Sequence, residues 1–250
     1  MIRVLLVLIW IVFYCILSII LLPIGYIISK INRGASQVYA ATLVKFVFKV
    51  ILFLSGTKTE VVGLENIPKD EAVLFVGNHR SYFDVVIGYT LVPLKTGFVA
   101  KKEMNRILII RQWMRLLRCP FLDRDNIKEG LKTILRGIDY IKDGTSIVIF
   151  PEGTRNSDDG LMEFHTGSFK LAEKSGCKII PMVQNNTDQI FEAHFPFIKR
   201  THTRIEFLEP IDMTNMSRDE KKEIPSKVYN IILENYNKHQ EEFTKTKKEI

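Results

Sequence analysis

The chain has 250 residues, a formal net charge of +7 and an ordinary overall fraction of hydrophobic residues, 46%. This length suits one α/β domain with a small appendage. The basic charge fits nucleic acid, a membrane surface or an anionic substrate, but the sequence has no zinc-finger, RNP-like or helix-turn-helix signature. The apolar residues gather in the first sixty positions. We therefore expect membrane lipids as partners and no nucleic acid.

The three cysteines, Cys15, Cys119 and Cys177, are odd in number and far apart in the sequence. This spacing fits reduced thiols in a protein that faces the cytosol better than a disulfide framework or a metal site. We therefore expect free thiols and no bound metal.

The first predicted element is an apolar helix. No charged residue lies between Val4 and Leu22, a length sufficient to cross a hydrocarbon core of ~30 Å. Pro23 and Gly25 interrupt the run, and Lys30 follows at its first polar break. The run is too long for a cleavable signal peptide, and no small-x-small cleavage site follows it. The segment is predicted to bind the membrane.

A second apolar segment, Val38 to Leu54, follows shortly. Within it, Thr42, Lys45 and Lys49 fall three and four positions apart, so they line one helical face. Such a face suits a helix in the lipid headgroup layer whose lysines reach outward. Two arrangements remain open, a membrane span followed by an interfacial helix, or a two-helix hairpin that dips into one leaflet. In the hairpin, the basic residues that would face the cytosol are Lys30, Arg33, Lys45, Lys49 and Lys58.

After these helices, short strands alternate with helices, a pattern typical of an α/β layered fold. We divide the chain into membrane-associating helices over residues 1–56 and an α/β domain over residues 57–250, with its motifs between residues 72 and 184. The expected strands are Thr59–Val62 (at an edge), Ala72–Val76, Gly97–Ala100, Pro120–Leu122, Ser146–Phe150 and Lys178–Gln184. The expected helices are Tyr82–Val92, Met104–Leu117, a helix capped by Asn126 that ends at Lys142, Ser168–Ser175, and Ser217–Lys238 followed by a frayed lysine-rich tail.

The stretch from Gly77 to Asp84 joins a buried strand to a helix, where α/β folds tend to hold reacting groups. Asp84 follows His79 by five positions, close enough across a turn to bond one imidazole nitrogen and leave the other to accept a proton. The alternative is that Ser81 and Asp84 form a helix capping box with His79 merely exposed beside it. The spacing alone favours the capping box, because such His–Asp pairs arise often by chance.

Two further strand ends lead into polar loops that contain arginine, at Arg124 and Arg155. The planar guanidinium suits phosphate, and Gly153 would let the backbone approach a ligand closely. Each arginine alone is more typical of a surface ion pair. Together with His79 and Asp84, they indicate a base and an anion clamp around one cleft.

Several well-known signatures are absent from the sequence, namely a Gly-x-Ser-x-Gly elbow, a Walker loop, Gly-x-Gly-x-x-Gly and His-Glu-x-x-His. A serine hydrolase is therefore disfavoured. The other histidines lack ligand spacing, and we expect surface or loop positions for His165, His194, His202 and His239.

Four blocks follow one another in the sequence, Asn78-His79-x4-Asp84, Phe121-Leu122-Asp123-Arg124, Phe150-Pro151-Glu152-Gly153-Thr154-Arg155 and Ile180-Pro181-Met182. In this order they resemble the four blocks of the glycerolipid acyltransferase family. Within that family the chain looks most like 1-acyl-sn-glycerol-3-phosphate acyltransferases of the bacterial PlsC type. The match spans about residues 60–184, and its first and third blocks together are highly specific.

The resemblance implies transfer of an acyl group to the sn-2 hydroxyl of lysophosphatidic acid, giving phosphatidic acid. It implies that His79 is the general base and that Asp84 orients the imidazole. The acyl donor would be acyl-CoA or acyl-acyl carrier protein, with no cofactor, and the active site would lie on the cytoplasmic face of the cell membrane. The residues that it assigns to substrate binding are Asn78, Lys101, Arg124, Glu152, Gly153, Thr154 and Arg155.

Departures from the family pattern leave the exact acceptor open. Between Lys101 and Phe121 the family usually has a turn with Pro and Gly that this chain lacks. His165-Thr166 stands where members usually place a lysine before Gly167. Another lyso-lipid acceptor is therefore an alternative. A lipid hydrolase and a non-enzymatic lipid-binding scaffold are further alternatives, but a scaffold does not need a base between two arginine loops.

Overall fold

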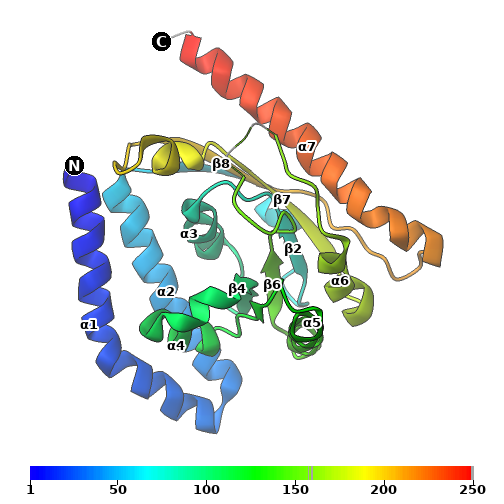
Figure 1. Ribbon diagram of the computed structural model, residues 1–250, viewed down its shortest axis with the longest axis horizontal. Coiled ribbons are helices and arrows are strands. Elements are labelled where there is room, and N and C mark those ends of the chain that lie inside the picture. Colours follow the sequence, from blue (N-terminus) through cyan, green and yellow to red (C-terminus); the bar gives the residue numbers. More distant parts are fainter. Residues whose placement is uncertain (157, 159, 249–250) are drawn as a thin grey trace.

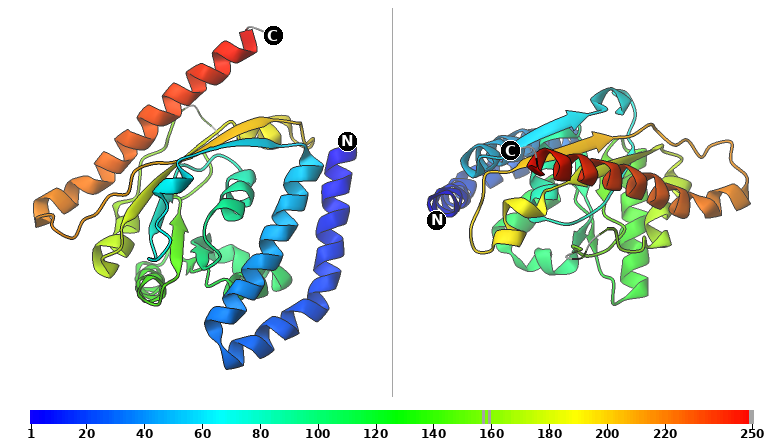
Figure 2. Two further views of the ribbon diagram at one scale, coloured as in Figure 1. Left: turned by 180° about the vertical axis from the view of Figure 1, so that it is seen from behind. Right: turned by 90° about the horizontal axis from the view of Figure 1, so that it is seen from above.

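A six-stranded sheet lies between two layers of helices in the computed structural model, which describes residues 1–156, 158 and 160–248 (Figure 1). Helices α1 to α4 pack on one face of the sheet, and α5 to α7 pack on the other. Figure 2 shows the pair α1 and α2 on the opposite side of the molecule from α7. This is the α/β layered fold that the sequence predicts, with two apolar helices at its amino-terminal end.

The strands follow the order β1-β8-β7-β2-β6-β3, and all neighbours are parallel except β7 and β8. Every residue of β2, β6 and β7 is buried, as expected for central strands covered by helices on both faces. The carboxyl ends of β2 and β6 therefore lie side by side. The strand bounds are Lys58–Val62 (β1), Leu74–Gly77 (β2), Thr96–Phe98 (β3), Ser146–Ile149 (β6), Ile179–Asn185 (β7) and His202–Phe207 (β8).

The helices begin near the positions that the sequence predicts. Asn126 caps α5 through the backbone N–H groups of Lys128 and Glu129. Two expected helices begin as 3-10 turns, η2 before α4 and η3 before α6. The bounds are Ile2–Ile31 (α1), Arg33–Ser55 (α2), Tyr82–Leu91 (α3), Leu108–Leu116 (α4), Ile127–Lys142 (α5), Lys170–Ser175 (α6) and Arg218–Lys248 (α7), with 3-10 turns at Leu64–Asn66 (η1), Lys102–Arg106 (η2), Thr166–Phe169 (η3), Asp188–Ile190 (η4) and Glu192–His194 (η5).

Two expected strands differ from the structure. The single strand expected over Gly97–Ala100 is divided, because Val99 N–H bonds to the carbonyl of Val148 whereas Ala100 N–H bonds to that of Pro120. The chain thus changes partner within one residue. The strand expected over Pro120–Leu122 consequently does not return to the main sheet. A separate two-stranded sheet results, from β4 (Ala100–Lys101) and β5 (Phe121–Leu122).

No strand or helix is predicted from the sequence for residues 185–216, where β8 lies. This strand separates β1 from β7, which leaves β1 at the edge of the sheet as predicted. Thr203, Ile205 and Phe207 are buried while their neighbours are more exposed. This alternation is the pattern of a half-buried strand, and it is the sequence feature from which β8 could have been predicted.

Helix α7 is longer than predicted, because the segment expected as a frayed tail is helical as far as residue 248. Residues 249–250 of the predicted domain lie outside the described residues. The expectation of a surface or loop position is wrong for His239, which lies on α7 and is 4% exposed. Its two ring nitrogens lie 3.0 Å from Asn185 Oδ1 and 2.9 Å from the Glu206 carboxylate. The packing of α7 against the sheet encloses it.

The two amino-terminal helices form a hairpin that turns at Asn32, whose side chain caps α2 (Figure 1). Both helices are long and apolar enough to cross a membrane, by length and composition. Helix α2 packs against α3 and α4, whereas α1 leaves most of its apolar side chains exposed. Helix α2 therefore lies along the α/β domain, and α1 is the helix with the larger exposed apolar surface.

Lys45 was expected on an outward-facing lysine face of the helix, but the structure places it elsewhere. Its ammonium donates to the carbonyls of Thr90 and Val92, where α3 ends. Unpaired carbonyls at the carboxyl end of a helix attract a cation. Lys45 therefore turns toward the domain, while Lys49 is exposed.

Candidate active site

His79 follows β2 directly and is held between Asp84 and Phe150. Its Nδ1 lies 2.9 Å from Asp84 Oδ2, and its ring stacks on Phe150 with centroids 4.3 Å apart and planes inclined by 11°. The Asp84 side chain is fully buried, whereas that of His79 is 17% exposed. A carboxylate that accepts the Nδ1 proton leaves Nε2, on the other side of the ring, as the nitrogen that can take up a proton.

The capping box and the His–Asp pair, which the sequence presents as alternatives, occur together. Ser81 Oγ accepts the backbone N–H of Phe83, and Asp84 Oδ2 accepts that of Ser81 at 2.7 Å. The same Oδ2 also accepts the backbone N–H of Arg80 at 2.6 Å and faces His79. The helix start therefore fixes the carboxylate that orients the imidazole.

The backbone of His79 is clamped by the loop that follows β6. Its N–H donates to Glu152 Oε1 at 2.6 Å, and its carbonyl accepts the N–H of Asn156 at 2.8 Å. The other oxygen of Glu152 accepts the N–H of Met162 at 2.8 Å. The first and third sequence blocks thus form one unit, in which Glu152 positions His79.

Burial raises the pKa of the Glu152 carboxyl above its ordinary value of 4.5, and the N–H groups of Met162 and His79 offset only part of this effect. The folded protein then binds this proton more tightly than the unfolded chain. The free energy of unfolding of the protein should therefore fall as the pH rises from the ordinary carboxyl pKa through the raised pKa of Glu152. A Glu152→Gln variant should lack this component. Urea unfolding of both proteins at several pH values tests it, and equal pH slopes would contradict it.

Arg124 and Lys101 lie at one cavity of about 190 Å³, lined by Lys101, Lys102, Glu103, Leu122, Arg124 and Asp125. The ammonium of Lys102 bonds to Asp123 and Asp125, each at 2.8 Å, so its charge is balanced. The ammonium of the exposed Lys101 lies 3.8 Å from the Glu103 carboxylate, which offsets its charge. The guanidinium of Arg124 is therefore the principal cation offered to an anion here.

Gly153 lies next to the Arg124 guanidinium and adopts a φ of 79°, in the left-handed region. A Cβ at this position would lie 3.4 Å from Arg124 Nη1 and 3.2 Å from the ring of His165. His165 is exposed, as expected, but it borders the site. The absence of a side chain at Gly153 keeps this space open beside the arginine.

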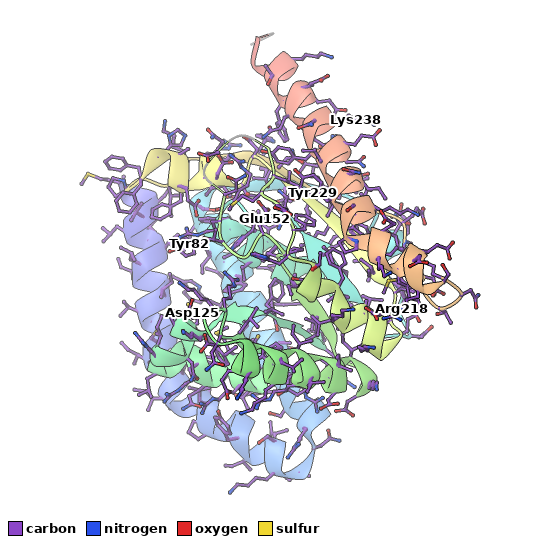
Figure 3. The ribbon with its side chains drawn as sticks, turned by 45° about the vertical axis from the view of Figure 1, so that its right-hand side comes forward. Tyr82, Asp125, Glu152, Arg218, Tyr229 and Lys238 are labelled. Carbon is purple, nitrogen blue, oxygen red and sulfur yellow. The ribbon has the colours of Figure 1, made fainter. Side chains whose placement is uncertain are left out.

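Arg155 is held in place by an aromatic ring and a carboxylate. Its guanidinium carbon lies 3.6 Å from the ring centroid of Tyr82, and Nη1 lies 3.2 Å from Glu192 Oε1. Glu192 also accepts the hydroxyl of Ser81 and the backbone N–H of Tyr82, each at 2.7 Å. One edge of the guanidinium is thus bound within the protein. In Figure 3, Tyr82 and Asp125 lie to the left of Glu152, and Tyr229 of α7 lies to its right.

Of the predicted binding residues, Asn78 is buried and Thr154 is exposed. The buried Asn78 exchanges two hydrogen bonds of 2.8 Å with the main chain of Gln184, which ties the end of β2 to β7. Thr154 is exposed in the loop beside Arg155. Glu192 and Thr187 were not among the predicted site residues. The Thr187 hydroxyl donates to Asp84 Oδ1. No local pattern marks either residue, because each follows the start of α3 by more than 100 positions in the sequence.

Residues 58–185, more than half of the chain, match the model of the Acyltransferase family. The chain belongs to the acyltransferase family. All four blocks lie inside the matched range, and the expected enzyme class is confirmed.

This acyltransferase is similar to proteins named 1-acyl-sn-glycerol-3-phosphate acyltransferase. It is 31% identical over 185 residues to the 1-acyl-sn-glycerol-3-phosphate acyltransferase of Borreliella burgdorferi, which covers 74% of each chain. It is 28% identical to the protein of the same name from Saccharomyces cerevisiae, over 72% of this chain and 60% of that one. The crystal structure of PlsC from Thermotoga maritima, a 1-acyl-sn-glycerophosphate acyltransferase, shares the fold with a TM-score of 0.73 at 22% identity, over 90% of this chain and 97% of that one.

Proposed function

We propose that this acyltransferase moves an acyl group from an acyl thioester to the sn-2 hydroxyl of 1-acyl-sn-glycerol 3-phosphate, giving phosphatidic acid. The observation that carries the proposal is the His79–Asp84 pair, with one imidazole nitrogen bound to a buried carboxylate and the other available. The arginine loops on the neighbouring segments and the activity for which the relatives are named support this choice of acceptor.

The proposed reaction needs only a base and a positioned acceptor. The sn-2 oxygen attacks the thioester carbonyl carbon while Nε2 of His79 takes the hydroxyl proton. The tetrahedral intermediate collapses, the C–S bond breaks, and the imidazolium returns the proton to the departing thiolate. Asp84 holds the imidazole in the required tautomer and stabilises its positive charge. No acyl-enzyme is formed.

Arg124 and Arg155 are proposed to hold the acceptor phosphate. Replacing either by alanine should raise KM for lysophosphatidic acid about tenfold to a hundredfold, because a charge-assisted hydrogen bond contributes roughly 1.5–3 kcal/mol. Monoacylglycerol, which lacks the phosphate, should be affected much less. Initial rates with both acceptors measure the difference, and Arg136→Ala, an exposed arginine on α5, is the matched control. Equal losses with both acceptors would contradict phosphate recognition.

Glu192 is proposed to position Arg155 without contacting the substrate. Glu192→Ala frees the guanidinium from one side, so KM for lysophosphatidic acid should rise about tenfold while kcat changes little. Glu192→Gln keeps an acceptor oxygen and should be milder. Measured kcat and KM for both variants separate the two effects. A fall in kcat at unchanged KM would assign Glu192 to the chemical step instead.

The hairpin of α1 and α2 is proposed to hold the enzyme on the cytoplasmic face of the cell membrane. The exposed apolar side chains of α1 would lie among lipid tails. The acyl chain of the acceptor then stays in the leaflet while its headgroup reaches His79. The donor is acyl-CoA or acyl-acyl carrier protein.

A further inference from the structure

A second cavity, of about 320 Å³, lies where the α1–α2 hairpin meets the α/β domain. Its walls come from four segments, the first turn of α2, the residue before β3, the carboxyl end of α4 and the carboxyl end of α5. The turn between α1 and α2, after which α2 begins, lies at the foot of Figure 1. The lining residues are Arg33, Gly34, Gln37, Lys95, Arg118 and Asp143.

The wall of this cavity is fixed by buried polar contacts. Gln37 is 1% exposed, donates to the carbonyl of Leu117 and accepts the hydroxyl of Thr145 at 3.1 Å. The guanidinium of Arg118 donates to Asp143 and lies 5.5 Å from the ring centroid of Tyr140. These contacts fix the walls of the cavity where the α1–α2 hairpin meets the α/β domain.

The charges around the cavity do not cancel. Arg118 and Asp143 balance each other. Arg33 and Lys95 are both exposed, and neither has a carboxylate within 4.0 Å in the part of the chain that the structure describes. Arg118 lowers the pKa of the Asp143 carboxyl most, and the charges of Lys95 and Arg33 lower it further. Two positive charges thus remain for an anion.

An exposed apolar surface on α1 directly precedes these cations in the chain. Ile27 and Ile31, in the last turns of α1, are 61% and 85% exposed, and Arg33 follows Ile31 after Asn32 alone. The ammonium of Lys95 lies 3.7 Å from where a Cβ would stand at Gly34, so Lys95 lies against the first turn of α2. Cations next to an apolar helix surface match the two parts of a phospholipid, a phosphate and an acyl chain.

We propose that this cavity binds the phosphate of an anionic phospholipid, with the acyl chains along Ile27 and Ile31. Arg33 and Lys95 neutralise the phosphate, and Arg118 lies behind them. Bound lipid fixes the hairpin against the domain at the depth of the headgroups. The inference does not depend on the proposed function, because none of these residues belongs to the active site.

Native mass spectrometry of the purified full chain in detergent tests this proposal, with phosphatidylglycerol, phosphatidylcholine and inorganic phosphate as probes. Every protein carries Arg124→Ala and Arg155→Ala, so that anion binding at the active site does not contribute. In this background, Arg33→Gln/Lys95→Gln removes the two unpaired cations. The matched control, Lys227→Gln/Lys238→Gln, removes two exposed charges from α7, on the other face of the sheet. Thermal unfolding verifies that all the proteins fold.

The background protein should bind one phosphatidylglycerol at least about tenfold more tightly than phosphatidylcholine, and only Arg33→Gln/Lys95→Gln should lose this preference. Unchanged lipid binding in that variant overturns the proposal. An equal loss in the α7 control overturns it as well, because the preference would then reflect diffuse charge. If inorganic phosphate binds as tightly as the lipid and the variant loses both, the phosphate site stands and the membrane source is wrong.

Discussion

Replacing His79 by alanine should lower kcat for phosphatidic acid formation by about 10³-fold, within the range of 10² to 10⁴ typical of a general base. The reason is that Nε2 is the group placed to take the hydroxyl proton. KM for lysophosphatidic acid should change little, because the phosphate is assigned to the arginines. Initial rates with a labelled acyl thioester measure both constants.

His202→Ala is the matched control for this substitution. His202 is an exposed histidine on β8, so its removal should leave kcat unchanged. Thermal unfolding of His79→Ala verifies its fold. A His79→Ala enzyme with wild-type kcat would show that the proton is removed by another group, and the assigned mechanism would then be wrong.

Asp84→Asn should lower kcat by about 10³- to 10⁴-fold, because an amide can present its NH₂ group to Nδ1 and select the wrong tautomer. It should also destabilise the fold by roughly 2 kcal/mol, because Asp84 accepts hydrogen bonds from His79, Arg80, Ser81 and Thr187. Kinetics and urea unfolding of the same protein measure the two losses.

Ser81→Ala separates these two roles of the helix start. It removes the cap on Phe83 and leaves the Asp84–His79 bond in place. It should cost about 1 kcal/mol of stability, with a far smaller loss of kcat than Asp84→Asn. If both variants lost kcat in proportion to their stability, Asp84 would have only a structural role.

Local patterns predicted most of the architecture. The cap at Asn126, the alternating strands and helices and the turn before Tyr82 all depend on neighbouring residues, so they could be read from the sequence. The strand β8 was not predicted because only Ile205 and Phe207 of its 6 residues are large and apolar, so its alternating pattern is weak. The pairing of β4 with β5 was not predicted because pairing between distant segments leaves no local pattern in the sequence.

The residues of the site also fall into two groups, those that a local pattern predicts and those that only the folded chain brings together. His79 and Asp84 are five positions apart, so their bond could be proposed, although the capping box competed with it until the four blocks were considered together. Glu192 and Thr187 reach the helix start through a loop that follows β7, and only the folded chain brings them there. Lys45 and His239 were misjudged because their buried partners, the end of α3 and the pair Asn185 and Glu206, lie far away in sequence.

The central claim is that His79 directs the acyl group straight to a lyso-lipid hydroxyl. Release of the carrier thiol from acyl-CoA and from acyl-acyl carrier protein tests it most directly, with wild type and His79→Ala, each with and without lysophosphatidic acid. We predict thiol release only when both His79 and the acceptor are present, with one phosphatidic acid formed for each thiol. Release at the same rate without acceptor, with free fatty acid as the product, would contradict the claim and identify a hydrolase.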